Sequence, residues 1–240
     1  MTSYETFARF YDAVNEEPRE RILQILKAIS TYRPDAGSVL ELGCGTGAVL
    51  AGLGSGLSLT GIDLSKEMLA YARRRCPHAR LIEGDITSFS LGEKFDVIVC
   101  VYDTLNHVTT FDGWLSVFDN VRAHLNKGGL FIFDVNTVGR LRELAEMVPW
   151  VHDFDGHTLI MDVSFDDGQI SMWDIRIFEH VSDDDFILHH ERIPELGVPL
   201  SRVRDALAPY FDLLEESDTV GGVATDESTR ALYVVQRKSD

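Results

Sequence analysis

The segment VLELGCGTGAVL, residues 39–50, sets the strongest constraint on the fold of this chain. An apolar run typical of a buried strand passes directly into three glycines, Gly43, Gly45 and Gly47, spaced by single residues. Glycine lets a strand turn sharply into a helix, and it lets a ligand approach the main chain where a Cβ would block it. The segment therefore predicts a strand, a tight turn and a helix, with a small-molecule site at the turn.

Strand-like and helix-like runs alternate from this segment to residue 136. The expected strands are SVLELG, LSLTGID, ARLIEGD, FDVIVCVYD and LFIFDVN, and the expected helices are AVLAGL, KEMLAYARRR and WLSVFDNVRAHL, with one more at residues 18–32. We expect a glycine stop at residues 127–129, between the last of these helices and its strand. Because the strands are apolar nearly throughout, they indicate a mostly parallel sheet with helices on both faces. In such an α/β fold, ligands bind beyond the carboxyl ends of the strands.

The pattern changes at residue 150. Residues 150–193 show no helical period, and the runs HTLIMDVSF, QISMWDIRIFEHV and FILHHERI are separated by turn signals, which predicts antiparallel hairpins. A helix at SRVRDALAPYF and strands at FDLLEESD and TRALYVVQRK follow. We therefore expect an α/β domain of residues 1–148 and 195–240, with an antiparallel β insertion at residues 149–194.

Two groups of side chains in the insertion leave alternatives open. The aromatic residues either line an apolar cavity or pack a small core of the insertion itself; they are Trp150, Phe154, Trp173 and Phe178. His189, His190 and Glu191 do not predict a metal site, since adjacent residues of a strand point to opposite faces. We predict no metal in this protein.

Charge and cysteine content limit the partners and the compartment. Lysine and arginine number 22 against 39 aspartate and glutamate residues, which gives a formal net charge of −17. Nucleic acids and anionic membranes need a basic face, so neither is an expected partner. Three cysteines without a CxxC pair, and no secretion signal at the start, favour reduced thiols and a cytoplasmic location. The sequence contains no run of 18 apolar residues, so it predicts no membrane span.

The glycine turn fits two classes of cofactor. Gly43, Gly45 and Ala48 also satisfy the G-x-G-x-x-A form of dinucleotide sites, with Asp63 near the position of a ribose-binding acid. A dinucleotide, however, would place a diphosphate over the turn, where the carboxylate of Glu41 does nothing to help it. A ligand with a sulfonium and an ammonium group gains from that carboxylate, and S-adenosylmethionine carries both.

Acids at the next two strand ends suit the same ligand. The Asp63 carboxylate is able to accept both ribose hydroxyls. Asp85 is able to accept from an adenine amino group, with the Ile86 amide near a ring nitrogen; the alternative is that Asp85 only forms a turn.

Five motifs in this order resemble the class I S-adenosylmethionine-dependent methyltransferases: ELGCGTG at 41–47, GIDLS at 61–65, GDI at 84–86, FDVIVCVYDTLNHV at 95–108 and KGGLFIFDVN at 127–136. The resemblance implies a Rossmann-like, seven-stranded sheet whose last strand is antiparallel. It implies that Gly43 and Gly45 lie under the methionine and ribose groups, and that Leu64 and Met68 line the adenine pocket. A carbonyl near Cys100 or Val101 would receive the methionine ammonium. Cys44 would be a small spacer rather than a nucleophile.

The acceptor site is expected after the fourth strand. Asp103 and His107 are the candidate catalytic residues, because either is able to orient or deprotonate an amine or hydroxyl. The alternatives are that Asp103 caps the following turn and that the backbone satisfies His107. Near the start, Tyr4, Phe7, Phe10 and Tyr11 have the spacing of one helix face. The resemblance implies a lid there, with Tyr11 and Asp12 closing over the cofactor.

These observations predict a methyltransferase that acts on a small-molecule acceptor. Two alternatives stay open: a catalytically silent S-adenosylmethionine-binding protein, and an NAD(P)-dependent oxidoreductase. Exposed strands of the insertion are able to pair two subunits, so a homodimer is possible. The sequence does not say whether nitrogen, oxygen or carbon is methylated.

Overall fold

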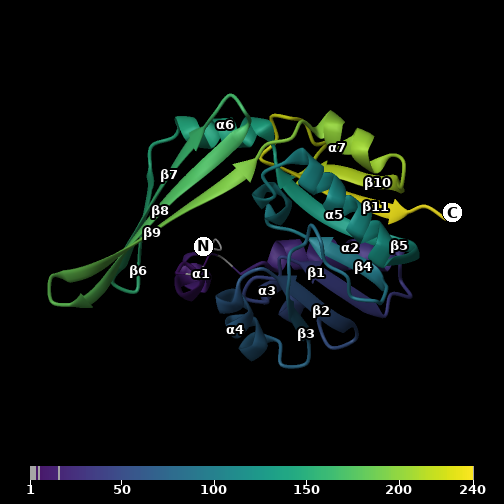
Figure 1. Ribbon diagram of the computed structural model, residues 1–240, viewed down its shortest axis with the longest axis horizontal. Coiled ribbons are helices and arrows are strands. Elements are labelled where there is room, and N and C mark those ends of the chain that lie inside the picture. The colour runs from purple at the N-terminus through teal and green to yellow at the C-terminus, as the bar shows by residue number, and fades with distance from the viewer. Residues whose placement is uncertain (1–3, 5, 16, 240) are drawn as a thin grey trace.

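A computed structural model describes residues 4, 6–15 and 17–239, and these residues form two sheets (Figure 1). The larger sheet has seven strands in the order β10-β11-β5-β4-β1-β2-β3. Their bounds are β1 Ser38–Leu42, β2 Ser58–Asp63, β3 Arg80–Glu83, β4 Phe95–Cys100, β5 Leu125–Asn136, β10 Phe211–Asp218 and β11 Arg230–Arg237. Neighbouring strands are parallel from β3 to β5, while β11 is antiparallel to both β5 and β10. The predicted seven-stranded sheet with an antiparallel last strand is confirmed.

Helices cover both faces of this sheet because its central strands are apolar on both sides. The helices of the α/β part are α2 Arg19–Tyr32, α3 Ala48–Leu53, α4 Lys66–Arg75, α5 Phe111–His124 and α7 Leu200–Leu207. Along β4, Val97 and Val99 pack with α2 and α3, while Ile98 and Cys100 pack with α5 and α7. Successive strand residues point to opposite faces, so one apolar run supplies both cores.

A second sheet projects from the α/β part as long hairpins (Figure 1). It consists of β6 Trp150–Phe154, β7 His157–Phe165, β8 Ile170–Ser182 and β9 Asp185–Leu196, paired antiparallel in chain order. The predicted hairpins are confirmed, and β9 continues to Leu196. The division into domains at residues 148/149 and 194/195 stays a prediction.

The first helix, α1 Ala8–Val14, lies against the second sheet. Phe7 and Phe10 are buried in one apolar cluster with side chains of β7, β8 and β9. The expected single helix face over residues 4–11 is wrong in its first part, because Tyr4 precedes the helix with a left-handed backbone (φ 71°). Its ring nevertheless stacks on Phe7 and meets the edge of Tyr11.

Two elements differ from the sequence prediction. The expected glycine stop at residues 127–129 is wrong, because β5 already begins at Leu125 and the glycines lie inside it. The β4–β5 register shifts between Phe95 and Val97, and Gly128 takes φ 67°, so these residues form a bulge in the strand. Helix α6, Val138–Glu146, was not predicted; Thr137 caps it by accepting from the Arg140 amide at 3.1 Å.

Each helix in the described part of the chain is too short or too polar to cross a membrane.

Candidate functional site

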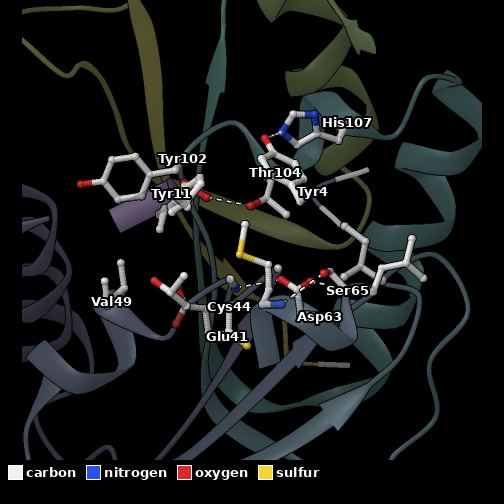
Figure 2. A pocket seen from close by; sticks show the side chains of 18 of the residues that line it. Tyr4, Tyr11, Glu41, Cys44, Val49, Asp63, Ser65, Tyr102, Thr104 and His107 are labelled. Carbon is white, nitrogen blue, oxygen red and sulfur yellow. Dashed lines mark hydrogen bonds between the residues drawn. The ribbon is translucent and has the colours of Figure 1, made fainter. Parts of the chain in front are cut away.

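The carboxyl ends of β1, β2, β3 and β4 border a cavity of about 970 Å³, within the range of small-molecule sites. All the residues predicted to bind the cofactor border it: Tyr11, Glu41, Gly43, Cys44, Gly45, Asp63, Leu64, Met68, Asp85, Ile86 and Val101. His107 borders it as well, while Asp103 lies behind the wall. Figure 2 shows Glu41, Cys44 and Asp63 on one side of this space and Tyr4, Thr104 and His107 on the other.

The glycine turn forms the floor of the cavity with three left-handed residues, at φ 67°, 51° and 79° for Gly43, Gly45 and Gly47. A Cβ on Gly43 would lie 2.3 Å from the Thr104 side chain, so this glycine lets the turn contact the segment after β4. A Cβ on Gly45 would have no atom within 4 Å, because this residue faces open space. The turn therefore presents a bare main chain to a ligand at Gly45.

Glu41 carries a buried carboxyl group near the tip of β1. It is 3% exposed, and its Oε2 atom has no hydrogen-bond partner among the described residues. Burial, and secondly the charge of Asp63, raise the pKa of Glu41 well above its usual range. A buried acceptor without a partner is costly, and a bound cation would supply that partner.

Asp63 joins the end of β2 to the glycine turn. One carboxylate oxygen accepts from the Gly45 amide and the other from the Ser65 amide, each at 2.8 Å. A carboxylate oxygen accepts more than one hydrogen bond, so capacity remains for ligand hydroxyls. Burial raises the pKa of Asp63, although the amide bonds oppose the shift.

Cys44 packs as a small buried side chain in the turn. A Cβ on Gly61 of β2 would lie 2.7 Å from its Sγ atom, so sulfur and strand are in close contact. Burial raises the pKa of Cys44 well above its usual range, which keeps it a thiol. This packing favours the spacer role that was expected for it.

The residues expected around an adenine ring come from the loop after β3 and the start of α4. Asp85 accepts from the amide and the hydroxyl of Thr87, both at 2.7 Å and both through Oδ1. The Oδ1 atom of Asp85 therefore forms a turn, as the alternative interpretation expected, and these two hydrogen bonds do not involve Oδ2. Met68 is buried, whereas Leu64 is 53% exposed. The Val101 carbonyl, across the cavity, accepts from the Thr104 hydroxyl at 2.9 Å.

The N-terminal segment closes one side of the cavity. The Asp12 carboxylate accepts from the Thr46 hydroxyl at 2.7 Å and pairs with Arg75 at 3.1 Å, which ties α1 to the glycine turn and to α4. On the other side, Glu191 of β9 accepts from three main-chain amides, those of Tyr4, Thr6 and Phe7, at 3.0, 2.7 and 3.0 Å. The segment is therefore held at both ends.

Asp103 follows β4 in a left-handed pair of residues. Tyr102 and Asp103 have φ 57° and 52°, and the amides of both donate to the carboxylate of Asp134, at 3.1 and 2.9 Å. The side chain of Asp103 forms no cap hydrogen bond, so the capping alternative is wrong. It forms an ion pair with Arg230 at 2.7 Å instead.

His107 ends a 3-10 turn, η1 Thr104–His107, at the cavity wall. Its Nε2 atom lies 3.1 Å from the Tyr4 hydroxyl, and its Nδ1 atom is buried without a hydrogen-bond partner among the described residues. Burial lowers the pKa of His107, opposed by the charge of Asp103. A neutral imidazole at neutral pH is a proton acceptor.

Sequence reasoning missed the charged residues that hold Asp103 in place. Asp134 of β5 is fully buried and pairs with Arg230 of β11 at 2.9 Å and with Arg21 of α2 at 3.2 Å. Glu195 of β9 is 2% exposed. One signal was present in the sequence: Asp134 interrupts the apolar run LFIFDVN. Glu195 gave none.

Glu195 completes a cluster behind the cavity wall. In the described part of the chain, one group of potential metal ligands has its ligating atoms within 4.8 Å of one another, formed by Asp103, His107 and Glu195. The adjacent histidines of β9 have separate partners, His189 with Glu179 at 2.8 Å and His190 with Asp174 at 3.0 Å.

The aromatic residues of the insertion do not border the cavity. Phe154 and Trp173 pack against the apolar cluster between the second sheet and the N-terminal segment, whereas Trp150 is 43% exposed. Phe154 and Trp173 therefore follow the core-packing alternative.

Comparison with known proteins identifies related sequences and folds. A family model described as a methyltransferase domain matches residues 39–129. The chain is 36% identical over 112 residues to dTDP-4-amino-2,3,4,6-tetradeoxy-D-glucose N,N-dimethyltransferase of Saccharopolyspora spinosa, covering 46% of this chain and 45% of that protein. It is 30% identical over 132 residues to dTDP-3-amino-3,6-dideoxy-alpha-D-glucopyranose N,N-dimethyltransferase of Streptomyces fradiae, covering 53% and 52%. The chain thus matches about half the length of these relatives.

A solved structure covers nearly the whole chain. The crystal structure of an S-adenosylmethionine-dependent methyltransferase from Clostridium acetobutylicum superposes with a TM-score of 0.87 at 23% identity, over 99% of this chain and 100% of that one. At this identity the likeness shows the fold, including the second sheet.

Proposed function

We propose that this chain transfers the methyl group of S-adenosylmethionine to a small-molecule acceptor. Two findings support the proposal: a methyltransferase-domain model matches residues 39–129, and the fold is like that of an S-adenosylmethionine-dependent methyltransferase. One observation carries the proposal. The Oε2 atom of Glu41, which has no hydrogen-bond partner among the described residues, and the bare main chain at Gly45 border the same cavity, which is large enough for the cofactor and an acceptor. A cationic ligand would stabilise that carboxylate, whereas a diphosphate would be repelled by it.

The residues of the cavity fit the cofactor group by group. Glu41 and the Val101 carbonyl would hold the ammonium of the methionine part, and the free lone pairs of Asp63 would accept from the ribose hydroxyls. The adenine ring would lie between Leu64, Met68 and the loop at Asp85. The cofactor supplies a methyl group already activated on a sulfonium, so alignment supplies much of the rate.

An amine is the acceptor class that we propose. The two relatives named above are N,N-dimethyltransferases of amino sugars by their names, and a neutral His107 at the cavity wall suits an acceptor that arrives protonated. Tyr4 and Tyr11 border the same space and add rings against which a cationic amine is able to pack. A small acceptor also accords with the net charge of −17, which disfavours a nucleic acid.

The two alternatives have no comparable support. An NAD(P)-dependent oxidoreductase would need to bind the diphosphate of its cofactor beside Glu41, whose carboxylate would repel it. A silent binding protein would be expected to have its acceptor space filled, whereas the cavity extends past the glycine turn to His107.

Titration calorimetry with S-adenosylmethionine and with NADH tests the proposed cofactor. We expect heat with the first and none with the second, and the loss of that heat in Asp63→Ala but not in the matched control Asp119→Ala, a change on the exposed side of α5. A screen of amine metabolites for release of S-adenosylhomocysteine then tests transfer. Binding of NADH alone would contradict the proposal, and binding without release on any acceptor would favour the silent alternative.

We also propose that the second sheet pairs two copies of the chain. β9 is an edge strand of that sheet, and the tip of the β8–β9 hairpin carries apolar side chains that are about half exposed: Val181 49%, Phe186 50%, Ile187 48% and Leu188 54%. Exposed apolar edges favour strand pairing with a second chain. Sedimentation should show a dimer, and Phe186→Asp should convert it to a monomer; a monomeric wild-type protein would contradict the idea.

The compartment is inferred from the thiols. The cysteines Cys44, Cys76 and Cys100 are free and buried, and the cytoplasmic location inferred from unpaired thiols stays a prediction.

A further inference from the structure

Behind the cavity wall, Asp103 and Glu195 come from distant parts of the chain, and a carboxylate oxygen of each and a ring nitrogen of His107 lie within 4.8 Å of one another. We propose that Asp103 and Glu195 hold one proton between them, with Glu195 neutral, so that a single ionised carboxylate lies between Arg230 and His107. The part of this proposal that concerns catalysis rests on the proposed function: Glu195 acts as a positioning residue that makes His107 the base for an amine acceptor.

The position of Glu195 is fixed by a buried hydrogen-bond network. The Asn136 side-chain amide donates to Glu195 Oε2 at 2.9 Å. Asn106 in turn holds the main chain of Asn136. Asn106 Oδ1 accepts from the main-chain amide of Asn136 at 3.0 Å, and Asn106 Nδ2 donates to the main-chain carbonyls of Asn136 and Leu196 at 3.1 and 2.9 Å. Because all these groups are buried, Glu195 is unable to turn toward solvent when it is charged.

The count of charges leaves Glu195 without an ion pair of its own, although Arg230 acts on it from farther away. Three carboxyl groups meet here, those of the buried Asp134 and Glu195 and of the partly buried Asp103, and two arginines face them. Arg230 contacts Asp103 at 2.7 Å and Asp134 at 2.9 Å, and Arg21 contacts Asp134 at 3.2 Å. No ion pair with Glu195 occurs among the described residues. A buried carboxylate without a cation takes up a proton.

The pKa directions agree with this count. Burial, and secondly the charge of Asp103, raise the pKa of Glu195 well above its usual range. Burial opposes ionisation of Asp103 as well, but Arg230 and His107 hold its pKa below the usual value. Of the two carboxyl groups, Asp103 is therefore the ionised one.

A proton suits this cluster better than a metal ion does. The Arg230 guanidinium already pairs with Asp103, and the Asn136 amide already donates to Glu195. A divalent ion would have to replace both, next to a fixed positive charge, whereas a shared proton needs no further room.

The arrangement defines where the proton of an acceptor goes. A protonated amine loses a proton to the imidazole of His107, and its nitrogen lone pair then forms the bond to the methyl carbon as the carbon–sulfur bond breaks and sulfur keeps the electron pair. The carboxylate of Asp103 stabilises the imidazolium. Other groups that face His107 are Tyr4, at 3.1 Å, the main-chain carbonyl of Pro194, and more distantly Asp63 and Arg230. Glu195 stays neutral throughout and changes no bond.

The first test needs neither cofactor nor acceptor. Infrared difference spectra of the ligand-free protein at pH 7, wild type minus Glu195→Gln, should contain the carbonyl stretch of a protonated carboxyl group. Glu41 is a second buried acid, so the same difference is taken in a Glu41→Gln background, where the band should persist. Carbon-13 NMR of labelled wild-type protein should show one glutamate, besides Glu41, that titrates well above the others. An ionised Glu195 at pH 7, or a stoichiometric metal ion retained on purification, would overturn the proposal.

The second test separates a neutral from an ionised Glu195 by activity. The amide of Glu195→Gln donates the same hydrogen bond, so we expect kcat within about tenfold of wild type and an unchanged acid limb of the pH profile. Asp103→Asn removes the negative charge, which lowers the pKa of His107 and moves the acid limb to lower pH. His107→Gln should lose about 10²- to 10⁴-fold in kcat.

Matched behaviour of the two carboxyl variants would refute the division of roles. If Glu195→Gln shifts the profile as Asp103→Asn does, Glu195 is ionised and the proposal fails. Calorimetry with S-adenosylmethionine on wild type and on each variant distinguishes the proposed function from this inference. If the proposed function is wrong, wild type does not bind the cofactor. If only this inference is wrong, wild type still binds it.

Discussion

The carboxyl group of Glu41 is the most informative single group to change, since its charge has opposite effects on the free and the bound protein. In the free protein the carboxyl is 3% exposed, one of its oxygens has no partner among the described residues, and its pKa is raised. In the bound protein the ionised form would contact a cation. Glu41→Gln removes the charge and keeps the shape, so it separates these two effects.

The effect on binding follows from the energy of one charge-assisted contact. Such a hydrogen bond contributes about 1.5–3 kcal/mol, and about 1.4 kcal/mol corresponds to a tenfold change in Kd. Calorimetry should therefore show that Glu41→Gln binds S-adenosylmethionine about 10- to 150-fold more weakly. Glu20→Gln is the matched control, because Glu20 borders the same cavity but is exposed, and its change should leave Kd nearly unaltered.

The effect on the stability of the free protein has the opposite sign. The pKa of Glu41 is higher in the folded state than in the unfolded chain, so its contribution to stability falls as the pH rises above the ordinary value of 4.5. At pH 7 the ligand-free variant should unfold at a higher temperature than wild type, and the difference should close as the pH falls toward 4.5. Saturating cofactor should reverse the order, because ligand stabilisation grows as Kd falls. Equal Kd values for wild type and Glu41→Gln would refute the electrostatic reasoning.

Three further predictions concern the floor, the support and the cover of the cavity. Gly45→Ala and Gly92→Ala both place a Cβ in open space at positive φ and should destabilise similarly, by about 1–2 kcal/mol in thermal unfolding, but only the former should weaken cofactor binding. Arg230→Met should lower the free energy of unfolding by about 3–5 kcal/mol, against less than about 1 kcal/mol for Arg80→Met in the exposed pair with Glu93; similar losses in urea would contradict the buried network. Glu191→Ala should speed hydrogen exchange at the three main-chain amides from which Glu191 accepts, and it should raise the rate at which the cofactor dissociates. Unchanged exchange would show that Glu191 does not hold the N-terminal segment over the cavity.

The cofactor side of the cavity could be predicted from the sequence because its residues follow parallel strands. The carboxyl ends of parallel strands meet at one edge of a sheet, so the acids at the ends of β1 and β2 and the loop after β3 had to lie near the glycine turn. Strand identity alone therefore placed Glu41, Asp63 and Asp85 around one space. The same logic does not reach a bulge such as that at Gly128, where one strand absorbs residues that sequence patterns treat as a stop.

The support of the acceptor side could not be predicted in the same way. Asp103 meets Arg230 because β11 is antiparallel to β5 in a register that pairs Arg230 with Asn136, and antiparallel register depends on the closing loop rather than on strand order. Glu195 arrives from the second sheet, at the far end of a β8–β9 ladder that begins at an exposed tip. Neither contact leaves a local pattern in the chain.

The position of Glu195 argues that the second sheet supplies chemistry to the site as well as cover. A sheet that only covered the cavity would gain more from an apolar residue at this place, since a buried carboxyl group that faces another carboxyl group is destabilising unless it is neutral and hydrogen-bonded. The last residues of β9 instead join the site through two buried amides, Asn106 and Asn136, which fix the carboxyl of Glu195 beside Asp103. A neutral acid in that place orients an ionised one without adding a second negative charge, and it thereby sets how strongly His107 attracts a proton.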